Sequence, residues 1–164
     1  MNIDIRLATE KDVPTILNII NHEIKNTTVV YDYNEKSLEA QLDWFHKKQQ
    51  EGLPVLVAER DGDVLAYGTY GVFRTWDAYR FSVEHSIYVD DKARGLGIGQ
   101  MMMQKLIDLA RENGYHTMVA GIDSSNEGSL EFHKKFGFEE VGRIKEVGYK
   151  FDQWLDLVFM QLLL

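Results

Sequence analysis

The chain has no cysteine among its 164 residues. This absence excludes disulfides, thiolate metal sites and a covalent cysteine acyl-enzyme. The sequence also lacks a run of about 18 apolar residues, the length that a membrane-spanning helix needs. Its first residues, MNIDIRLATEKD, lack the apolar stretch of a signal peptide. We therefore expect a cytoplasmic protein with no membrane partner.

Positive charge is scarce as well, since 18 lysines and arginines face 26 acidic residues and the net charge is -8. This balance argues against nucleic acid as the main partner, although a local basic site for a polyanionic cofactor is compatible with it. The histidines show no H-E-x-x-H spacing, and no G-x-S-x-G elbow is present. We expect no metal.

Hydrophobic residues make up 45% of the sequence, which is typical of a globular chain. Its length suits a single domain spanning 1–164. The first helix is capped by Thr9 or Asp12, and Pro14 suits Asp12 better. Ser37 caps a second helix, with Leu38, Leu42 and Phe45 on one face. Alternation and turn residues predict strands at 2–8, 55–59, 64–72, 84–89, 117–122, 138–150 and 154–164, and further helices at 98–110 and 129–136. This order predicts an α/β fold, with a mixed central β-sheet and helices on both faces.

The stretch from Val83 to Ala110 predicts an anion site, because a strand, a glycine-rich loop and a helix start follow one another. Backbone N–H groups are free at a helix N-terminus, and the helix dipole adds positive charge there. Gly95, Gly97 and Gly99 have no Cβ, so a diphosphate could lie directly on the main chain. Such a loop can also be only a tight turn.

The residues around these glycines narrow the choice of ligand. A P-loop needs Gly-Lys-Ser/Thr at its end, but Gly99 is followed by Gln100. Gln100 also stands where a dinucleotide fingerprint needs its third glycine. What remains, Arg94-x-x-Gly97-x-Gly99, resembles the diphosphate motif of the GNAT (GCN5-related) N-acetyltransferase superfamily, whose members bind acetyl-CoA.

A second motif supports this resemblance. The segment from Asn126 to Phe138 is similar to the superfamily segment in which an asparagine contacts the pantetheine arm. The resemblance covers nearly the whole chain and implies the GNAT fold. It also implies that the following residues line the cofactor site: Ile87, Tyr88, Val89, Arg94, Gly95, Leu96, Gly97, Ile98, Gly99, Gln100, Asn126 and Lys135.

Transfer of an acetyl group to an amine needs a base, donors for the oxyanion and a leaving thiolate. Without cysteine, direct attack in a ternary complex is the simplest scheme. Glu84 is the candidate base, acting directly or through water, because partial burial would raise its pKa. Backbone N–H groups near Tyr88 or Val89 would stabilise the oxyanion. His133 is a candidate acid for the thiolate, or it only contacts the cofactor.

The acceptor side resembles the phosphinothricin and methionine sulfoximine acetyltransferases, through Ala78–Glu84 and Gly148–Asp156. That group implies a small amino acid whose acidic group meets an arginine, and Arg74 suits this role. Its pattern places Arg74, Thr75, Trp76, Glu84, His85 and Ser86 at the acceptor. In a regular strand His85 would face away from Glu84. The resemblance and the apolar end at 155–164 also favour a homodimer.

Two other functions fit the sequence less well. A GNAT enzyme could act on a polyamine or a protein N-terminus, but Arg74 and Arg80 favour an anionic small molecule. A non-catalytic acyl-CoA-binding module would keep the glycine loop and need no base at position 84.

Overall fold

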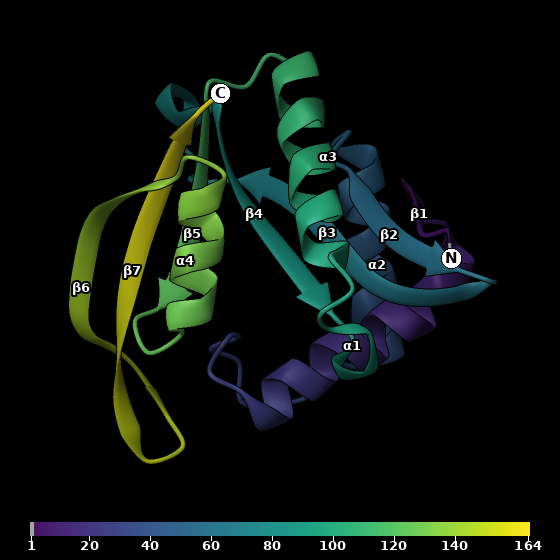
Figure 1. The fold of residues 1–164 in the computed structure, drawn as a ribbon, viewed down its shortest axis with the longest axis horizontal. Coiled ribbons are helices and arrows are strands. Elements are labelled where there is room, and N and C mark those ends of the chain that lie inside the picture. Colours follow the sequence, from purple (N-terminus) through teal and green to yellow (C-terminus); the bar gives the residue numbers. More distant parts are fainter. Residues whose placement is uncertain (1) are drawn as a thin grey trace.

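A computed structural model describes residues 2–164, so Met1 of the predicted domain lies outside the described residues. Seven strands form one sheet in the order β1-β2-β3-β4-β5-β7-β6 (Figure 1). The strands are β1 (Asp4–Leu7), β2 (Val55–Arg60), β3 (Asp63–Val72), β4 (Ser82–Val89), β5 (Thr117–Asp123), β6 (Glu139–Lys150) and β7 (Gln153–Leu163). The helices are α1 (Val13–Asn26), α2 (Leu38–Gln50), α3 (Ile98–Glu112) and α4 (Glu127–Lys135). Within residues 2–164, no helix is long and apolar enough to cross a membrane.

Helix starts lie where the sequence predicted them. Asp12 precedes α1 and Pro14 lies in its first turn, but the Asp12 carboxylate makes no capping hydrogen bond to α1 and accepts from Arg6 and the Thr9 N–H, while Thr9 precedes a short 3-10 turn at Glu10–Asp12. Ser37 caps α2, because its hydroxyl oxygen accepts a hydrogen bond from the Ala40 N–H at 3.1 Å. Leu38, expected on the buried face of α2, is exposed because it lies in the first turn.

Helices cover both faces of the sheet, as predicted. Side chains of α3, including Met102 and Leu106, pack on one face with Val83 of β4. Side chains of α1 and α2, including Ile16 and Phe45, pack on the other face with Val57 and Tyr67. The sheet therefore separates two apolar layers, and a residue's parity along a strand decides which layer it enters.

The sheet opens in its middle. Strands β4 and β5 are parallel and pair only over Ser82–Glu84 and Thr117–Val119. Beyond these residues β4 remains paired with β3 through Val89, and β5 remains paired with β7 through Asp123. The two strands consequently diverge after Glu84, and the edge of β4 that faces β5 has unpaired backbone groups from there on.

Candidate active site

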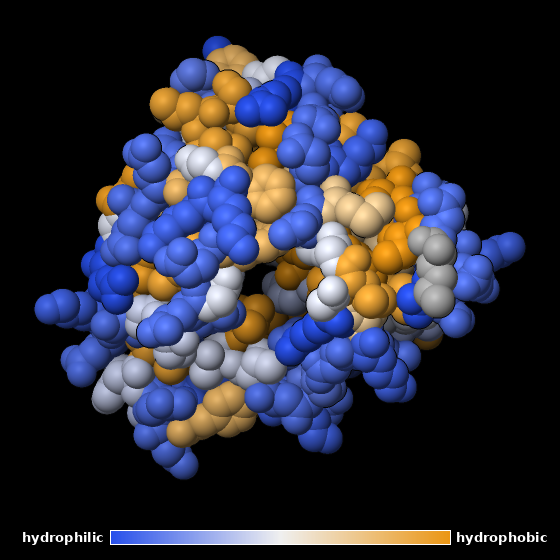
Figure 2. Space-filling view, in the orientation of Figure 1, coloured by the Kyte–Doolittle hydropathy of each residue, from blue (hydrophilic) through white to orange (hydrophobic). Residues whose placement is uncertain are grey.

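A cleft of about 410 Å³ lies where β4 and β5 separate. Figure 2 shows it as a hollow near the centre of the molecule. Residues of β4, the start of α3, the end of β5 and α4 line it together. Nine of the predicted site residues are among them: His85, Ser86, Ile87, Tyr88, Val89, Arg94, Gly99, Asn126 and His133.

The glycine loop leads into the N-terminus of α3 beside this cleft. Gly95 and Gly97 have φ angles of 81° and 77°, in the left-handed region that favours glycine. In the described part of the chain, the backbone N–H groups of residues 95–99 have no hydrogen-bond acceptor. A run of free N–H groups at the start of a 15-residue helix suits a diphosphate.

Asn126 projects into the cleft from the start of α4. Its side-chain oxygen accepts a hydrogen bond from the Ser129 N–H at 3.1 Å and so caps the helix. The cap fixes the amide group, and its NH2 end remains available for an acceptor in the cleft.

Glu84 is the last β4 residue paired with β5, at the mouth of the opening. Its carboxylate extends across to β5 and lies over Gly121, where a Cβ would come within 3.1 Å of Oε1. Burial raises the pKa of Glu84, although the positive charge of Arg74 opposes this rise. The raised pKa confirms the direction expected from the sequence. The sequence neighbours Phe81 and Val83, among which we expected Glu84 to be partly buried, do not surround it, since Phe81 is exposed and Val83 faces the other apolar layer.

His85 and His133 form a buried pair on the other face of β4. Their Nε2 atoms are 3.0 Å apart, and His133 Nδ1 lies 2.7 Å from the carbonyl oxygen of Ser129. A carbonyl only accepts, so His133 carries its proton on Nδ1 and His85 donates from Nε2 to His133. His85 Nδ1 is buried and has no partner among residues 2–164. Both rings are then neutral imidazoles.

The electrostatics of the pair agree with neutral rings. Burial, with the neighbouring His133, lowers the pKa of His85 to about 3. Burial also lowers the pKa of His133, although its hydrogen bond to Ser129 opposes this. A neutral imidazole with both nitrogens engaged is a poor proton donor at neutral pH. The geometry favours a contact role for His133 over an acid, and it places His85 on the face away from Glu84.

Other predicted residues lie outside the cleft lining. Arg74, Thr75 and Trp76 are exposed on the connection between β3 and β4. Arg74 stacks on Phe73, with its guanidinium carbon 4.3 Å from the ring centre, and its charge reaches Glu84. Lys135 lies at the far end of α4 and borders a separate shallow hollow with Gln100. Gly95, Leu96 and Gly97 directly precede α3 and are not part of the cleft lining, and the Ile98 side chain is buried in the apolar layer under α3.

Sequence reasoning missed eight residues of the cleft lining, and two of them bear directly on the chemistry. Gly121 gives Glu84 its space, and a glycine inside an apolar strand is a known sign of close approach. Glu23 lines the cleft from α1 although it is only 3% exposed. The sequence gives little indication that Glu23 lines a cleft, because a glutamate on a helix is usually solvated.

Comparisons with known proteins agree with this geometry. Residues 5–159 match the family described as an acetyltransferase (GNAT) domain. An L-methionine sulfoximine/L-methionine sulfone acetyltransferase from Pseudomonas aeruginosa is 44% identical, over 99% of this chain and 95% of that protein.

Solved structures are also similar. The yncA acetyltransferase from Salmonella typhimurium, described with its cofactor acetyl-CoA, has a TM-score of 0.97 and 40% identity, covering 99% of this chain and 94% of that one. A ribosomal-protein-alanine N-acetyltransferase from Brucella melitensis has a TM-score of 0.97 and 45% identity, covering 98% of this chain and 99% of that one. The chain belongs to the GNAT acetyltransferase family.

Proposed function

We propose that this protein is an acetyl-CoA-dependent N-acetyltransferase that acetylates the α-amino group of a small amino acid of the methionine sulfoximine, methionine sulfone or phosphinothricin type. One observation carries this proposal. A carboxylate with a raised pKa, that of Glu84, stands where β4 and β5 separate and a cleft begins. A base at this position would stand beside a space that can hold a thioester.

The residues present fit acetyl-CoA. Its diphosphate would lie on the free N–H groups of residues 95–99, with the Arg94 guanidinium beside it. Its pantetheine arm would run along the unpaired edge of β4 at 87–89 and meet the amide of Asn126. Acetyl-CoA supplies the acetyl group as a thioester.

Glu84 acts on the acceptor. Its carboxylate takes a proton from the acceptor's ammonium group, directly or through water, so that the nitrogen gains a lone pair for attack. Backbone N–H groups near Tyr88 and Val89 donate to the carbonyl oxygen, where negative charge develops. The nitrogen attacks the thioester carbon, the C–S bond breaks, and the CoA thiolate takes the second proton of the nitrogen, directly or through water. No acyl-enzyme is needed, because holding both substrates together provides most of the acceleration. His133 contacts the cofactor as a neutral ring.

The acceptor's acidic group would meet Arg74, whose charge already influences Glu84. Thr75, Trp76 and Ser86 complete this side of the site in the proposal. A protein N-terminus is the second candidate acceptor, because the Brucella structure is described as a ribosomal-protein-alanine N-acetyltransferase. The cytoplasmic location and the single domain over 1–164 expected from the sequence stay predictions.

A thiol-release assay tests the proposal. The purified protein is incubated with acetyl-CoA and, in parallel, with methionine sulfoximine, methionine sulfone, phosphinothricin, a polyamine or a peptide with an N-terminal alanine. We expect release with the amino acids at a kcat/KM at least about tenfold above the other two, a margin that one lost ionic contact can produce. Preference for the peptide would move the acceptor class to protein N-termini, and no release with any amine would favour a binding module.

Glu84→Gln tests the base. We expect kcat to fall about 100-fold or more while the Kd of CoA stays within about twofold, because only the proton-accepting group is lost. Turnover near the wild-type level would remove Glu84 from the mechanism.

We also propose a homodimer. The apolar segment at 155–164 that suggested a dimer cannot provide the interface. It forms β7, which lies between β5 and β6, and its side chains Leu155, Val158 and Met160 are buried. The β6–β7 hairpin supports the proposal instead: Figure 1 shows it at the edge of the sheet. It exposes large apolar side chains, namely Val141, Ile144, Val147, Tyr149, Phe151 and Trp154.

Sedimentation analysis at micromolar concentration tests the assembly. We expect a mass of two chains for the wild type and a monomer for Val147→Glu, because a charge in an apolar interface lacks a partner. A wild-type monomer would reject the dimer.

A further inference from the structure

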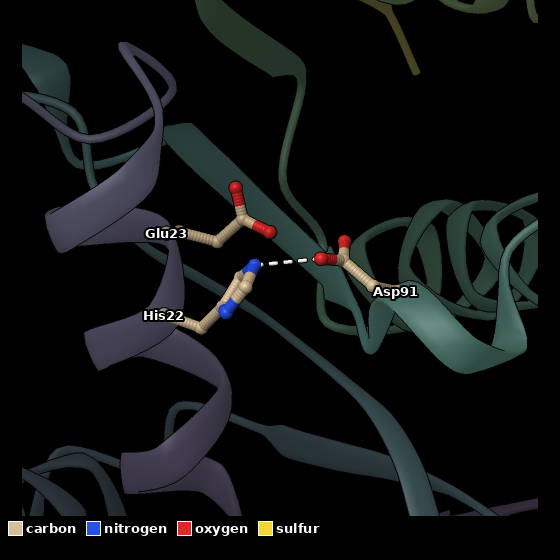
Figure 3. A group of neighbouring side chains, drawn as sticks. All are labelled: His22, Glu23 and Asp91. Carbon is tan, nitrogen blue, oxygen red and sulfur yellow. Dashed lines mark ion pairs between the residues drawn. The ribbon is translucent and has the colours of Figure 1, made fainter.

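Glu23 of α1 and Arg94 of the glycine loop form an ion pair beside the cleft. Arg94 Nη2 lies 2.6 Å from Glu23 Oε1 and 2.7 Å from Asp91 Oδ1. The Thr27 hydroxyl lies 3.0 Å from the second Glu23 oxygen and 2.9 Å from the Glu23 backbone carbonyl oxygen, so its single hydrogen is shared between these two acceptors. Figure 3 shows Glu23 and His22 projecting from α1 toward Asp91, which precedes α3. Both Glu23 oxygens are therefore engaged, and the carboxylate is fixed.

The contacts on Arg94 leave one edge of its guanidinium open. Both carboxylates use the same nitrogen, Nη2, and within residues 2–164 neither Nη1 nor Nε has a hydrogen-bond partner. The guanidinium group presents its donors as a planar fork. Holding Nη2 therefore restricts the direction of the remaining donors, and Arg94 lines the same cleft as Gly99, at the end of the segment with free N–H groups.

The cluster of His22, Glu23 and Asp91 has side chains that could also bind a metal ion. Ligand atoms of His22, Glu23 and Asp91 all lie within 4.8 Å of one another. The Arg94 guanidinium already supplies the positive charge there, at hydrogen-bond distance from two of the three residues. The remaining one, His22, pairs with Asp91 at 2.6 Å. The cluster is better explained as a support for arginine.

The two supporting carboxylates are not equivalent. The Glu23 side chain is 4% exposed, whereas that of Asp91 is 45% exposed. An exposed ion pair contributes little, because solvent screens it and both side chains can move. A buried carboxylate, fixed by a second hydrogen bond, restricts its partner far more. Glu23 is therefore the residue that limits where Arg94 can point.

We infer that Glu23 is a positioning residue, which holds Arg94 so that the open edge of its guanidinium faces the diphosphate of acetyl-CoA. This inference rests on the proposed function. A free arginine would have to be ordered when the ligand binds, and that ordering reduces affinity. Glu23 orders Arg94 in advance, so the effect belongs to ligands that carry a diphosphate and not to the thioester end.

Glu23→Asp tests this inference. The change keeps the charge but retracts the carboxylate by one methylene, so it no longer reaches Nη2. We expect the Kd of CoA, measured by calorimetry, to rise about fivefold, the size of one lost preorganised side chain. With S-acetylpantetheine, which has no diphosphate, kcat/KM should stay within about twofold. Glu59→Asp is the matched control, because it retracts a carboxylate of β2 from Arg6 of β1, at one edge of the sheet and outside the cleft lining.

The outcomes separate this inference from the proposed function. Failure of the wild type to bind CoA would reject the proposed function itself. Binding by the wild type with an unchanged Kd in Glu23→Asp would overturn the inference alone. Equal losses with CoA and with S-acetylpantetheine would also overturn it, because they indicate general distortion. In an Arg94→Ala background we expect Glu23→Asp to add no further loss, and a full additional loss would contradict the pairing.

Discussion

The position of the Glu84 carboxylate depends on the absence of a side chain at Gly121, on the neighbouring strand β5. The carboxylate crosses from β4 to β5 and occupies the space that a side chain at Gly121 would fill. Leu157 Cδ1 lies 3.5 Å from the position that a Cβ at Gly121 would take, so the Glu84 oxygen and an apolar side chain border the same space. Burial raises the pKa of Glu84. The position of the base is therefore set by a residue on another strand.

Gly121→Ala should reduce turnover without harming the fold. The new methyl group would lie 3.1 Å from Glu84 Oε1, so the carboxylate must shift, and kcat should fall about tenfold because general-base catalysis depends on position. The Kd of CoA should stay within about twofold. Steady-state kinetics and calorimetry measure the two quantities.

Gly142→Ala is the control for this change. It is also a strand glycine, but nothing lies within 4 Å of its added methyl group. We expect wild-type kinetics for this variant. Unchanged kcat in Gly121→Ala would show that the carboxylate is not constrained as described.

The residue patterns predicted much of the site. Strand parity correctly separated His85 from Glu84, because alternate side chains of β4 enter different layers. The pairing of His85 with His133 was not predictable, since 48 residues separate them and neither has a local signal. The same holds for Glu23 and Arg94, which only the packing of α1 against the glycine loop brings together.

At the level of elements, local signals predicted helices and strands to within a few residues. Ser37 precedes α2 as predicted, and glycines that typically end helices, Gly52, Gly114 and Gly137, follow α2, α3 and α4 with positive φ, since caps and left-handed residues act over one turn. The point where β4 and β5 separate has no such signal. It depends on which strand β5 pairs with beyond Val119, and that is a property of the whole sheet.

Lys150, at the end of β6, is a buried lysine that binds α1 and the loop after it. The sequence did not indicate this role, because it depends on how distant elements pack. Lys150 Nζ donates to the carbonyl oxygens of Ile24, Thr27 and Val30, at 2.7, 2.8 and 2.7 Å. These bonds attach the loop after α1 to the end of β6. Thr27 also holds Glu23, so the β6–β7 hairpin supports the same loop that supports the candidate cofactor site. A lysine near a strand end would ordinarily be assigned to solvent.

At the scale of the whole molecule, a protein with a net charge of -8 can still bind a polyanionic ligand. Binding depends on the groups at the site and not on the total charge. The free N–H groups before α3 attract phosphate without any net positive charge. The acidic surface still opposes approach over longer distances, and salt screens that repulsion. Composition argues against nucleic acid as the main partner, but it could not locate the anion site.

Global stability should fall as the pH decreases from 7 to 5. The folded pKa of His85 is about 3, below the ordinary value of about 6.5 that it has when unfolded. Below pH 6.5 the unfolded chain binds a proton that the folded chain excludes, so the stabilisation present above pH 6.5 is lost progressively. At pH 5 the loss from His85 alone is about 2 kcal/mol, and the lowered pKa of His133 adds to it. Glu84 contributes with the opposite sign, because its folded pKa is raised.

Urea unfolding at the two pH values measures this loss, and His85→Gln isolates its source. The glutamine amide can still donate to His133 Nε2 but does not titrate, so the difference in unfolding free energy between pH 7 and pH 5 should shrink by about 2 kcal/mol. The Arg6–Asp12 ion pair does not interfere, because the pKa of Asp12 is lowered to about 2 and its contribution is complete above pH 4. Equal pH dependence in the variant and the wild type would mean that the folded protein already accepts a proton at this pair.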